Sequence, residues 1–309
     1  MNKFLTSKQV VISFVVGIFG VAMLSSWVTV SAQTESEEIP TATRIKDPTQ
    51  LKLQGVQDTF IPPSLKIEEP PEVRGVIGQD QRIPMTSQQM PWSAIGRVEM
   101  VVNSQGQKSH CTGTLVTKNV VLTNAHCVVN HKTSEFYSQI KFSPNVINGK
   151  ARDVAYATKF YLGTDFKDGN YNDDWAFIVL DKPIGEDYGY LGWKSLSPET
   201  LIKDKKKYVF VGYSGDFPNS PQYRGLKAGL GMTAGVHPGC SITGEEDGLL
   251  KHDCDTTGGS SGGPIIAWIN QKPYIVALNN MEVTSRANGT PLFNLAVKIS
   301  RIEQVLNGQ

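Results

Sequence analysis

Short runs rich in β-branched and aromatic residues recur along the chain from Val76 onward, and this pattern constrains the fold more than any other feature. Clusters of Gly, Pro, Asn and Asp separate the runs, which is a spacing typical of an all-β sandwich or barrel. The runs are GRVEMVV at 96–102, NVVLTNA at 119–125, WAFIVL at 175–180, KYVFVGY at 207–213, PIIAWI at 264–269 and YIVAL at 274–278. A helix is expected only at the C-terminus, where four apolar residues recur at helical spacing on one face: Leu295, Ile299, Ile302 and Leu306.

The N-terminus has the pattern of a signal peptide. Two lysines precede an apolar run from Val10 to about Leu24, and VSAQ at 30–33 offers small residues for cleavage after Ala32. We therefore expect residues 1–32 to be a signal peptide. An uncleaved membrane anchor is the alternative, because the apolar run is long for a signal peptide.

A polar, proline-rich segment, residues 33–75, follows the expected signal peptide. It shows no sustained period of either a strand or a helix, so we expect a pro-segment or disordered linker there. The alternative is an N-terminal arm that wraps around the folded domain.

The composition argues against two classes of partner. The chain has 309 residues and a formal net charge of +1, so there is no electrostatic case for binding nucleic acid or an acidic membrane surface. We expect no nucleic-acid partner, and no membrane contact once the signal peptide is cleaved.

The cysteines suggest disulfides rather than a metal site. Their even count in an exported chain allows three pairings. No C-x-x-C occurs, and the histidines do not lie at metal-ligand spacing from the cysteines. The stretch DFKDGNYNDD at 165–174 resembles a calcium loop in composition but lacks the spacing and terminal Glu of an EF-hand, so we expect no metal. The four cysteines are Cys111, Cys127, Cys240 and Cys254.

The stretch DCDTTGGSSGGPI at 253–265 places two serines among four glycines. A serine hydroxyl needs a base within hydrogen-bond reach, and the base needs an orienting acid. GSSGG at 259–263 also satisfies G-x-S-x-G, but hydrolases that use that turn have the order Ser, acid, His. None of the five histidines follows Ser261, so the order His, Asp, Ser remains.

His126 is the best candidate base, because it ends the run NVVLTNAH, a strand followed by a polar turn. Asp174 directly precedes the apolar run WAFIVL and is the preferred acid, and Asp173, one residue further into the loop, is the alternative. The glycines let the backbone approach a substrate carbonyl, so that the amides of Gly259 and Ser261 can stabilise an oxyanion.

Three motifs resemble the trypsin/chymotrypsin-like serine peptidases: TNAHC around His126, DDWAFIVL at Asp174 and GGSSGGP at Ser261. VIGQDQRIP at 76–84, GYSGD at 212–216 and CDTTGGSSGGP are similar to the bacterial V8-like, glutamyl-endopeptidase-type branch in particular. The resemblance covers roughly Val76 to Asn307. It implies that His126 is the general base and acid, that Asp174 orients it, and that Ser261 is the nucleophile.

The resemblance also implies the fold. Two packed antiparallel six-stranded β-barrels, at roughly 90–190 and 200–295, would form an all-β, chymotrypsin-like domain over 76–309 with a C-terminal helix. The site would lie in the cleft between the barrels. The implied disulfides are Cys111 with Cys127, beside His126, and Cys240 with Cys254, bracing the loop that leads to Ser261.

The chain departs from the family pattern near the nucleophile. The residue before it is Ser260, where trypsin-like enzymes have an Asp that pairs with the freed N-terminal amine, so activation of a zymogen would work differently. Thr256 fits the V8-like pocket for glutamate, but Asn279 replaces the pocket histidine, and a neutral amide binds a carboxylate more weakly than imidazolium does. Asp255 stands where trypsin-like enzymes that cut after Lys or Arg have their pocket acid, and the alternative is that it turns away into the loop.

These observations predict a secreted serine endopeptidase, extracellular or periplasmic, that needs no cofactor. Its substrates would be proteins or peptides, and we expect a monomer. Two alternatives stay open: a non-catalytic binding module on a peptidase fold, and an esterase-like serine hydrolase without preference for peptides.

Overall fold

The computed structural model describes residues 39–51, 53, 58–71, 80–219, 223–284 and 291–308. The predicted signal peptide, 1–32, lies outside these residues, and so do parts of the 33–75 segment. Within the described ranges, no helix combines the length and apolar composition that a membrane span requires.

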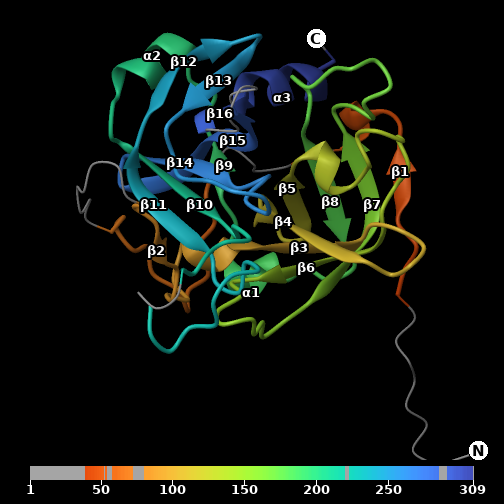
Figure 1. The fold of residues 1–309 in the computed structure, drawn as a ribbon, viewed down its shortest axis with the longest axis horizontal. Helices are drawn as coiled ribbons and strands as arrows, with labels where there is room; N and C mark the ends of the chain where they lie inside the picture. The colour runs from red at the N-terminus through yellow and green to blue at the C-terminus, as the bar shows by residue number, and fades with distance from the viewer. Residues whose placement is uncertain are drawn as a thin grey trace, which may run out of the picture. The chain divides into compact units, whose positions relative to one another are not determined.

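The first half of the domain is a closed antiparallel barrel of six strands (Figure 1). The strands neighbour one another in the order β7-β6-β3-β4-β5-β8, and pairing of β7 with β8 closes the barrel. In β3, buried Val98 and Met100 alternate with the partly exposed Arg97 and Glu99, the period of a strand with one face toward a core. The strands are β3 (Ile95–Val101), β4 (Lys108–Leu115), β5 (Val120–Thr123), β6 (Ser138–Pro144), β7 (Ala155–Leu162) and β8 (Ala176–Leu180).

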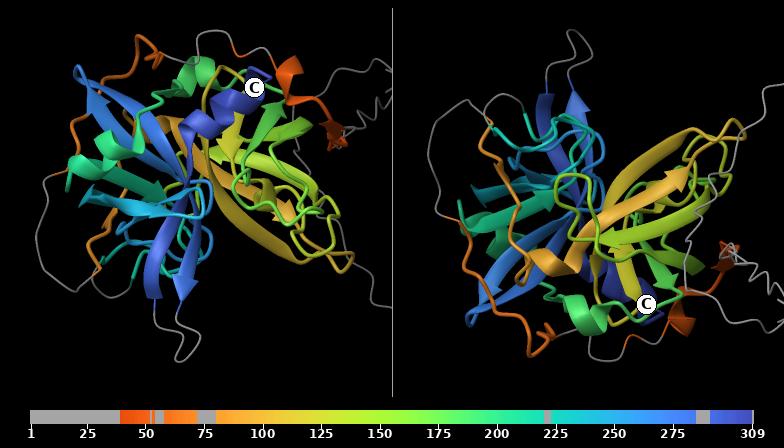
Figure 2. Two further views of the ribbon diagram at one scale, coloured as in Figure 1. Left: turned by 90° about the horizontal axis from the view of Figure 1, so that it is seen from above. Right: turned by 90° about the horizontal axis from the view of Figure 1, so that it is seen from below.

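The second half is a nine-stranded sheet in the order β12-β13-β16-β15-β14-β10-β11-β2, with β9 parallel to β15. Figure 2 shows this group, mostly teal and blue, beside the yellow and green strands of the first barrel. The bounds are β2 (Ile83–Pro84), β9 (Gly192–Trp193), β10 (Tyr208–Gly212), β11 (Gly235–Cys240), β12 (Ile242–Glu246), β13 (Leu249–His252), β14 (Pro264–Ile269), β15 (Lys272–Thr284) and β16 (Pro291–Lys298).

The expected chymotrypsin-like, all-β fold is confirmed, with one closed barrel and a second sheet packed against it. The second sheet has nine strands rather than the expected six, and two of them, β2 and β9, are only two residues long. One apolar core joins both halves. It contains Leu122 and Phe177 from the barrel together with Val209, Ile266 and Val297 from the sheet.

The described part of the chain has few helices, and the expected C-terminal one is confirmed as α3 (Ile299–Leu306). Ile299 and Ile302 are buried on its inner face. The inclusion of Leu295 in that helix was wrong, because it lies in β16, where it pairs with Lys251 and Met281 on the neighbouring strands. The other helices are short: η1 (Pro48–Gln50), η2 (Trp92–Ala94), η3 (Ala125–Cys127), α1 (Gly185–Tyr188) and α2 (Pro198–Lys203).

The described part of the 33–75 segment packs on the domain. Strand β1 (Thr43–Ile45) adds to the barrel parallel to β7, as Figure 1 shows at the edge of the barrel. Single bridges pair Phe60 with Tyr190 and Ile67 with Met90. These contacts are those expected of an arm that wraps the domain, and whether the segment is removed as a pro-segment stays a prediction.

Candidate active site

Two neighbouring strands of the barrel bring His126 and Asp174 together. Strand β5 pairs with β8 in antiparallel fashion, with Thr123 opposite Ala176. His126 follows the end of β5, in the short helix η3, and Asp174 precedes the start of β8. Because the end of one antiparallel strand lies beside the start of its neighbour, both residues fall at the same edge of the barrel.

The Asp174 carboxylate holds His126 at two points. His126 Nδ1 and Asp174 Oδ2 lie 2.6 Å apart, and the backbone N–H of His126 donates to Asp174 Oδ1 at 2.9 Å. The side chain of Asn124 donates to the backbone oxygen of Asp174 at 2.7 Å. The Asp174 side chain is 2% exposed, whereas that of His126 is 24% exposed, so the imidazole can present Nε2 to a substrate.

The pKa of His126 is raised by its acid partner. Burial lowers the pKa of His126, but the charge of Asp174 and the hydrogen bond to it outweigh burial, so the pKa lies above its ordinary value of 6.5. An imidazole that binds a proton more tightly is a stronger base for a hydroxyl group.

Two glycines shape the loop that carries Ser261. Gly259 has a φ of +98°, and a Cβ there would lie 2.4 Å from His110 Nε2. Gly262 has a φ of +78°, and a Cβ there would lie 2.2 Å from Thr123 Oγ1. Both positions therefore require glycine for conformation and for space. The loop is rich in glycine because it packs closely against the barrel that carries His126.

The loop leaves the expected oxyanion donors available. In the part of the chain that the structure describes, neither the Gly259 amide nor the Ser261 amide donates a hydrogen bond within the protein. The carbonyls of the same residues are held by one residue of β4, because Thr112 donates its hydroxyl to Gly259 O at 3.0 Å and its backbone N–H to Ser261 O at 2.8 Å. Free N–H groups on a held backbone are what an oxyanion site requires.

Ser261 and His126 line the same cleft, which has a volume of about 800 Å³. The Ser261 hydroxyl donates to the backbone oxygen of Asn280 at 3.4 Å, a long hydrogen bond that is easily exchanged. Catalytic hydrogen bonds are often long before substrate binds. The cleft is therefore lined by the candidate base and by Ser261, which carries the candidate nucleophile and one of the two candidate oxyanion amides.

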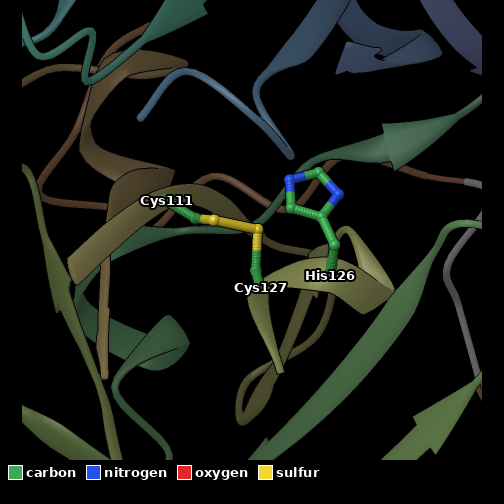
Figure 3. Close-up of side chains that lie close together, drawn as sticks. All are labelled: Cys111, His126 and Cys127. Carbon is green, nitrogen blue, oxygen red and sulfur yellow. A yellow bond between two sulfur atoms is a disulfide. The ribbon is translucent and has the colours of Figure 1, made fainter. Parts of the chain in front are cut away.

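Both disulfides that the resemblance implied are formed. Cys111 of β4 is bonded to Cys127, and Figure 3 shows this disulfide beside the ring of His126. The two sulfurs and the imidazole lie within 4.8 Å of one another. Because the sulfurs are bonded to each other, they are not thiolate ligands, and the group braces the histidine loop.

The pocket residues expected from the sequence divide into two groups. Thr256 and Asn279 line the cleft. Asp255 is not among its described lining residues, because its carboxylate accepts from the backbone N–H of Gln81 at 2.7 Å and lies 3.3 Å from His237 Nδ1. Asp255 thus turns away from the cleft, toward partners in the segment before β2 and in β11 rather than within its own loop.

Asn279 is occupied by internal hydrogen bonds. Its Nδ2 donates to the backbone oxygen of Ser260 at 3.1 Å, and its Oδ1 lies 3.1 Å from His252 Nε2. Burial lowers the pKa of His252 to about 4, although the hydrogen bond to Asn279 opposes this, so His252 is neutral near pH 7. The amide is therefore not free to bind a charged substrate side chain.

The other candidate acid, Asp173, is committed elsewhere. It accepts from Arg301 of α3 at 2.6 and 2.8 Å and from Asn170 at 2.6 Å. Among the remaining histidines, His110 lies 2.8 Å from the backbone oxygen of Tyr213, beneath Gly259. His131 is exposed at the rim of the cleft.

Sequence reasoning missed several residues that line or hold the site. Asn280 and Thr112 act through their backbone and hydroxyl groups, which no spacing pattern reveals. Two exposed acids, Asp247 and Glu282, line the cleft on the side of the second sheet. No lysine or arginine is found among the described residues that line it.

Comparisons with known proteins show which family and fold the chain is similar to. The profile of the family described as Trypsin matches residues 84–305. A glutamyl endopeptidase from Bacillus licheniformis is 28% identical over 236 residues, covering 75% of this chain and 67% of that protein. Serine protease 23 from Homo sapiens is 26% identical over 224 residues, covering 62% of this chain and 54% of that protein.

A solved structure of a Glu endopeptidase in complex with MPD is similar in fold. It has a TM-score of 0.58 and 26% sequence identity, and the match covers 76% of this chain and 98% of that one. The chain thus spans nearly all of that structure, but only about half the length of Serine protease 23.

Proposed function

The chain belongs to the trypsin family, and from this premise we propose that it is a secreted serine endopeptidase acting through Ser261, His126 and Asp174. The observation that carries the proposal is the 2.6 Å contact between His126 Nδ1 and a buried Asp174, facing the cleft that Ser261 also lines. In that arrangement only Nε2 of the imidazole is left to act as the base.

The reaction proceeds through an acyl-enzyme. Ser261 Oγ attacks the peptide carbonyl while His126 Nε2 takes the hydroxyl proton, and the amides of Gly259 and Ser261 stabilise the oxyanion. His126 then gives the proton to the leaving amine. A water molecule, deprotonated by the same imidazole, attacks the ester carbonyl, and the returning proton restores the Ser261 hydroxyl. Asp174 stabilises the imidazolium that forms in each half of the cycle.

Two features support export. The chain begins with the charged and apolar pattern of a signal peptide, and its four cysteines form two disulfides. Disulfides persist in oxidising compartments. We propose that cleavage follows Ala32, and that residues 76–309 contain the peptidase domain, which acts on protein or peptide substrates as a monomer.

Labelling with a fluorophosphonate probe tests the nucleophile. The full chain is expressed for export, its mature N-terminus is determined, and the purified protein is incubated with the probe and with a peptide mixture. We expect one label on Ser261 and peptide cleavage, both abolished in Ser261→Ala. Ser104→Ala is the matched control, since Ser104 is exposed on the turn between β3 and β4 and is not among the described residues that line the cleft.

The other classes predict different results. If the chain were a binding module on the same fold, the folded wild-type protein would not be labelled by the probe and would not cut the peptide mixture. An esterase-like hydrolase would label and hydrolyse activated esters, but would leave the peptide mixture intact. Either result overturns the proposal.

A further inference from the structure

We propose that Arg82 is a positioning residue that holds the loop of Ser261 in its working conformation through Asp216 and Thr257. The inference deepens the proposed function and rests on it for the identity of the nucleophile. The residues involved lie before β2, after β10 and before Ser261, so three distant parts of the chain meet.

Arg82 is a buried cation with two carboxylate partners. It is 5% exposed. Its guanidinium donates to both oxygens of Asp80, at 2.8 and 2.7 Å, and to both oxygens of Asp216, at 2.9 and 2.8 Å. It also lies over the ring of Phe217, 5.0 Å from the ring centre. Two bidentate contacts use the fork geometry that only arginine offers.

Asp216 connects Arg82 to the loop of Ser261. Thr257 donates its hydroxyl to Asp216 Oδ1 at 2.6 Å. Burial raises the pKa of Asp216, but the hydrogen bonds from Arg82 and Thr257 outweigh it, so the pKa is lowered and the acceptor stays ionised. The Asp216 side chain is 49% exposed, so its position depends on the groups that hold it.

Thr257 in turn holds the residue before the nucleophile. Its backbone oxygen accepts from the backbone N–H of Ser260 at 3.1 Å and from the Ser260 hydroxyl at 2.6 Å. Gly259 and Ser261, whose amides are the proposed oxyanion donors, flank Ser260 directly. The route from Arg82 to the oxyanion amides therefore contains Asp216, Thr257 and Ser260.

The segment that contains Arg82 also contacts the loop of Ser261 at Asp255. The backbone N–H of Gln81 donates to Asp255 at 2.7 Å, and the backbone N–H of Asp255 donates to His237 Nδ1 at 2.7 Å. Pairing of β2 with β11 anchors the segment just after Arg82. Residues 80–84 thus hold Asp255 directly, through the Gln81 amide, and Thr257 indirectly, through Arg82 and Asp216.

The test compares variants of the full exported chain. Arg82→Ala is expected to lower both the rate of fluorophosphonate labelling and kcat/KM by about 10-fold to 100-fold, the effect of misplacing reacting groups by about 1 Å. The loss should be mainly in kcat. Arg82→Lys keeps the charge but not the two bidentate contacts, so its labelling rate and kcat/KM should lie between those of wild type and Arg82→Ala. Arg152→Ala is the control, because Arg152 also pairs with an aspartate and lies over a tyrosine ring, but outside the cleft.

A second variant separates positioning from stability. Thr257→Val removes one hydroxyl and should reproduce the kinetic loss even if Arg82→Ala fails to fold. The double variant should be no slower than the slower single variant, because both changes break one chain of contacts. Wild-type labelling rates in folded Arg82→Ala and Thr257→Val, or fully additive losses, would overturn the proposal.

Hydrogen exchange gives a readout that does not need activity. In Thr257→Val and Arg82→Ala, the hydrogen-bonded amides of Asp255, Ser260 and Gly262 should exchange faster than in wild type, while those of β3 should not change. If wild type neither labels nor cuts but the exchange result holds, the proposed function fails and the positioning role stands. Unchanged exchange in a protein that does cut would refute only the role of Arg82.

Discussion

His126 Nδ1 and Asp174 Oδ2 lie 2.6 Å apart, and the second oxygen of the same carboxylate accepts the backbone N–H of His126 at 2.9 Å. A carboxylate fastened in this way fixes the tautomer of the ring as well as its direction, because Nδ1 must carry the proton that it donates. The pair therefore determines which nitrogen faces Ser261.

Asp174→Asn should lower kcat on the order of 10⁴-fold, because an amide can present its N–H to Nδ1 and so favour the wrong tautomer. Steady-state kinetics on a peptide substrate measure this. Asp173→Asn is the matched variant, since Asp173 contacts Arg301 and Asn170 instead. It should lower the unfolding temperature but keep kcat within about tenfold. The opposite ranking of the two variants would show that the acid is Asp173.

The activity should fall in acid with a midpoint set by His126. Burial lowers the pKa of His126, but the charge of Asp174 and the hydrogen bond to it outweigh burial and raise it. Only the neutral ring can accept a proton. A raised pKa means that kcat/KM increases with pH until it levels off above the ordinary value of 6.5. In Asp174→Asn the raising charge is lost while burial remains, so the pKa should move down. NMR titration of the His126 ring in both proteins measures the shift, and an upward or absent shift contradicts it.

Cleavage should not require glutamate or aspartate at the position before the cut. The cleft contains Asp247 and Glu282, no lysine or arginine is present among its described lining residues, and Asn279 is already hydrogen-bonded. An acidic substrate side chain would be desolvated beside like charges, so we expect lysine, arginine or neutral residues to be favoured by about tenfold or more.

Digestion of a diverse peptide mixture, analysed by mass spectrometry with Ser261→Ala as control, measures this preference. Glu282→Gln should reduce cutting after lysine and arginine relative to neutral residues. Cuts confined to glutamate and aspartate would contradict the expectation and would indicate that Thr256 and Asn279 suffice for a V8-like pocket.

Stability should fall as the pH drops from about 6.5 to about 4, in part through His252. Burial lowers the pKa of His252 to about 4, so as the pH falls this histidine is protonated in the unfolded chain before it is protonated in the native state. Each pH unit in that window therefore lowers the free energy of unfolding by about 1.4 kcal/mol. The full loss is on the order of 3 kcal/mol. Urea unfolding of wild type and His252→Gln at pH 7 and pH 4 measures it. Equal losses in both proteins would show that His252 is not responsible.

Much of the fold could be predicted from local patterns. The runs at 96–102, 119–125 and 175–180 became β3, β5 and β8, because alternating or continuous apolar residues must face a core in a sheet. Leu295 was assigned to the wrong element, since an apolar residue at helical spacing is equally suited to a strand that ends just before the helix. The short strands β2 and β9 were not predicted, because two residues carry too little pattern.

The sequence by itself determined the class of fold, the motifs of the proposed triad and the glycines of the nucleophile loop, since these depend on residue type and on spacing along the chain. Only the tertiary structure decided that Asp255 turns toward Gln81, that Asn279 is held by His252, and that Arg82 reaches Thr257 through Asp216. The physical reason is that a charged or amide side chain is satisfied by whichever partner packing brings within hydrogen-bond distance. That partner lies tens to hundreds of residues away, where no local pattern records it.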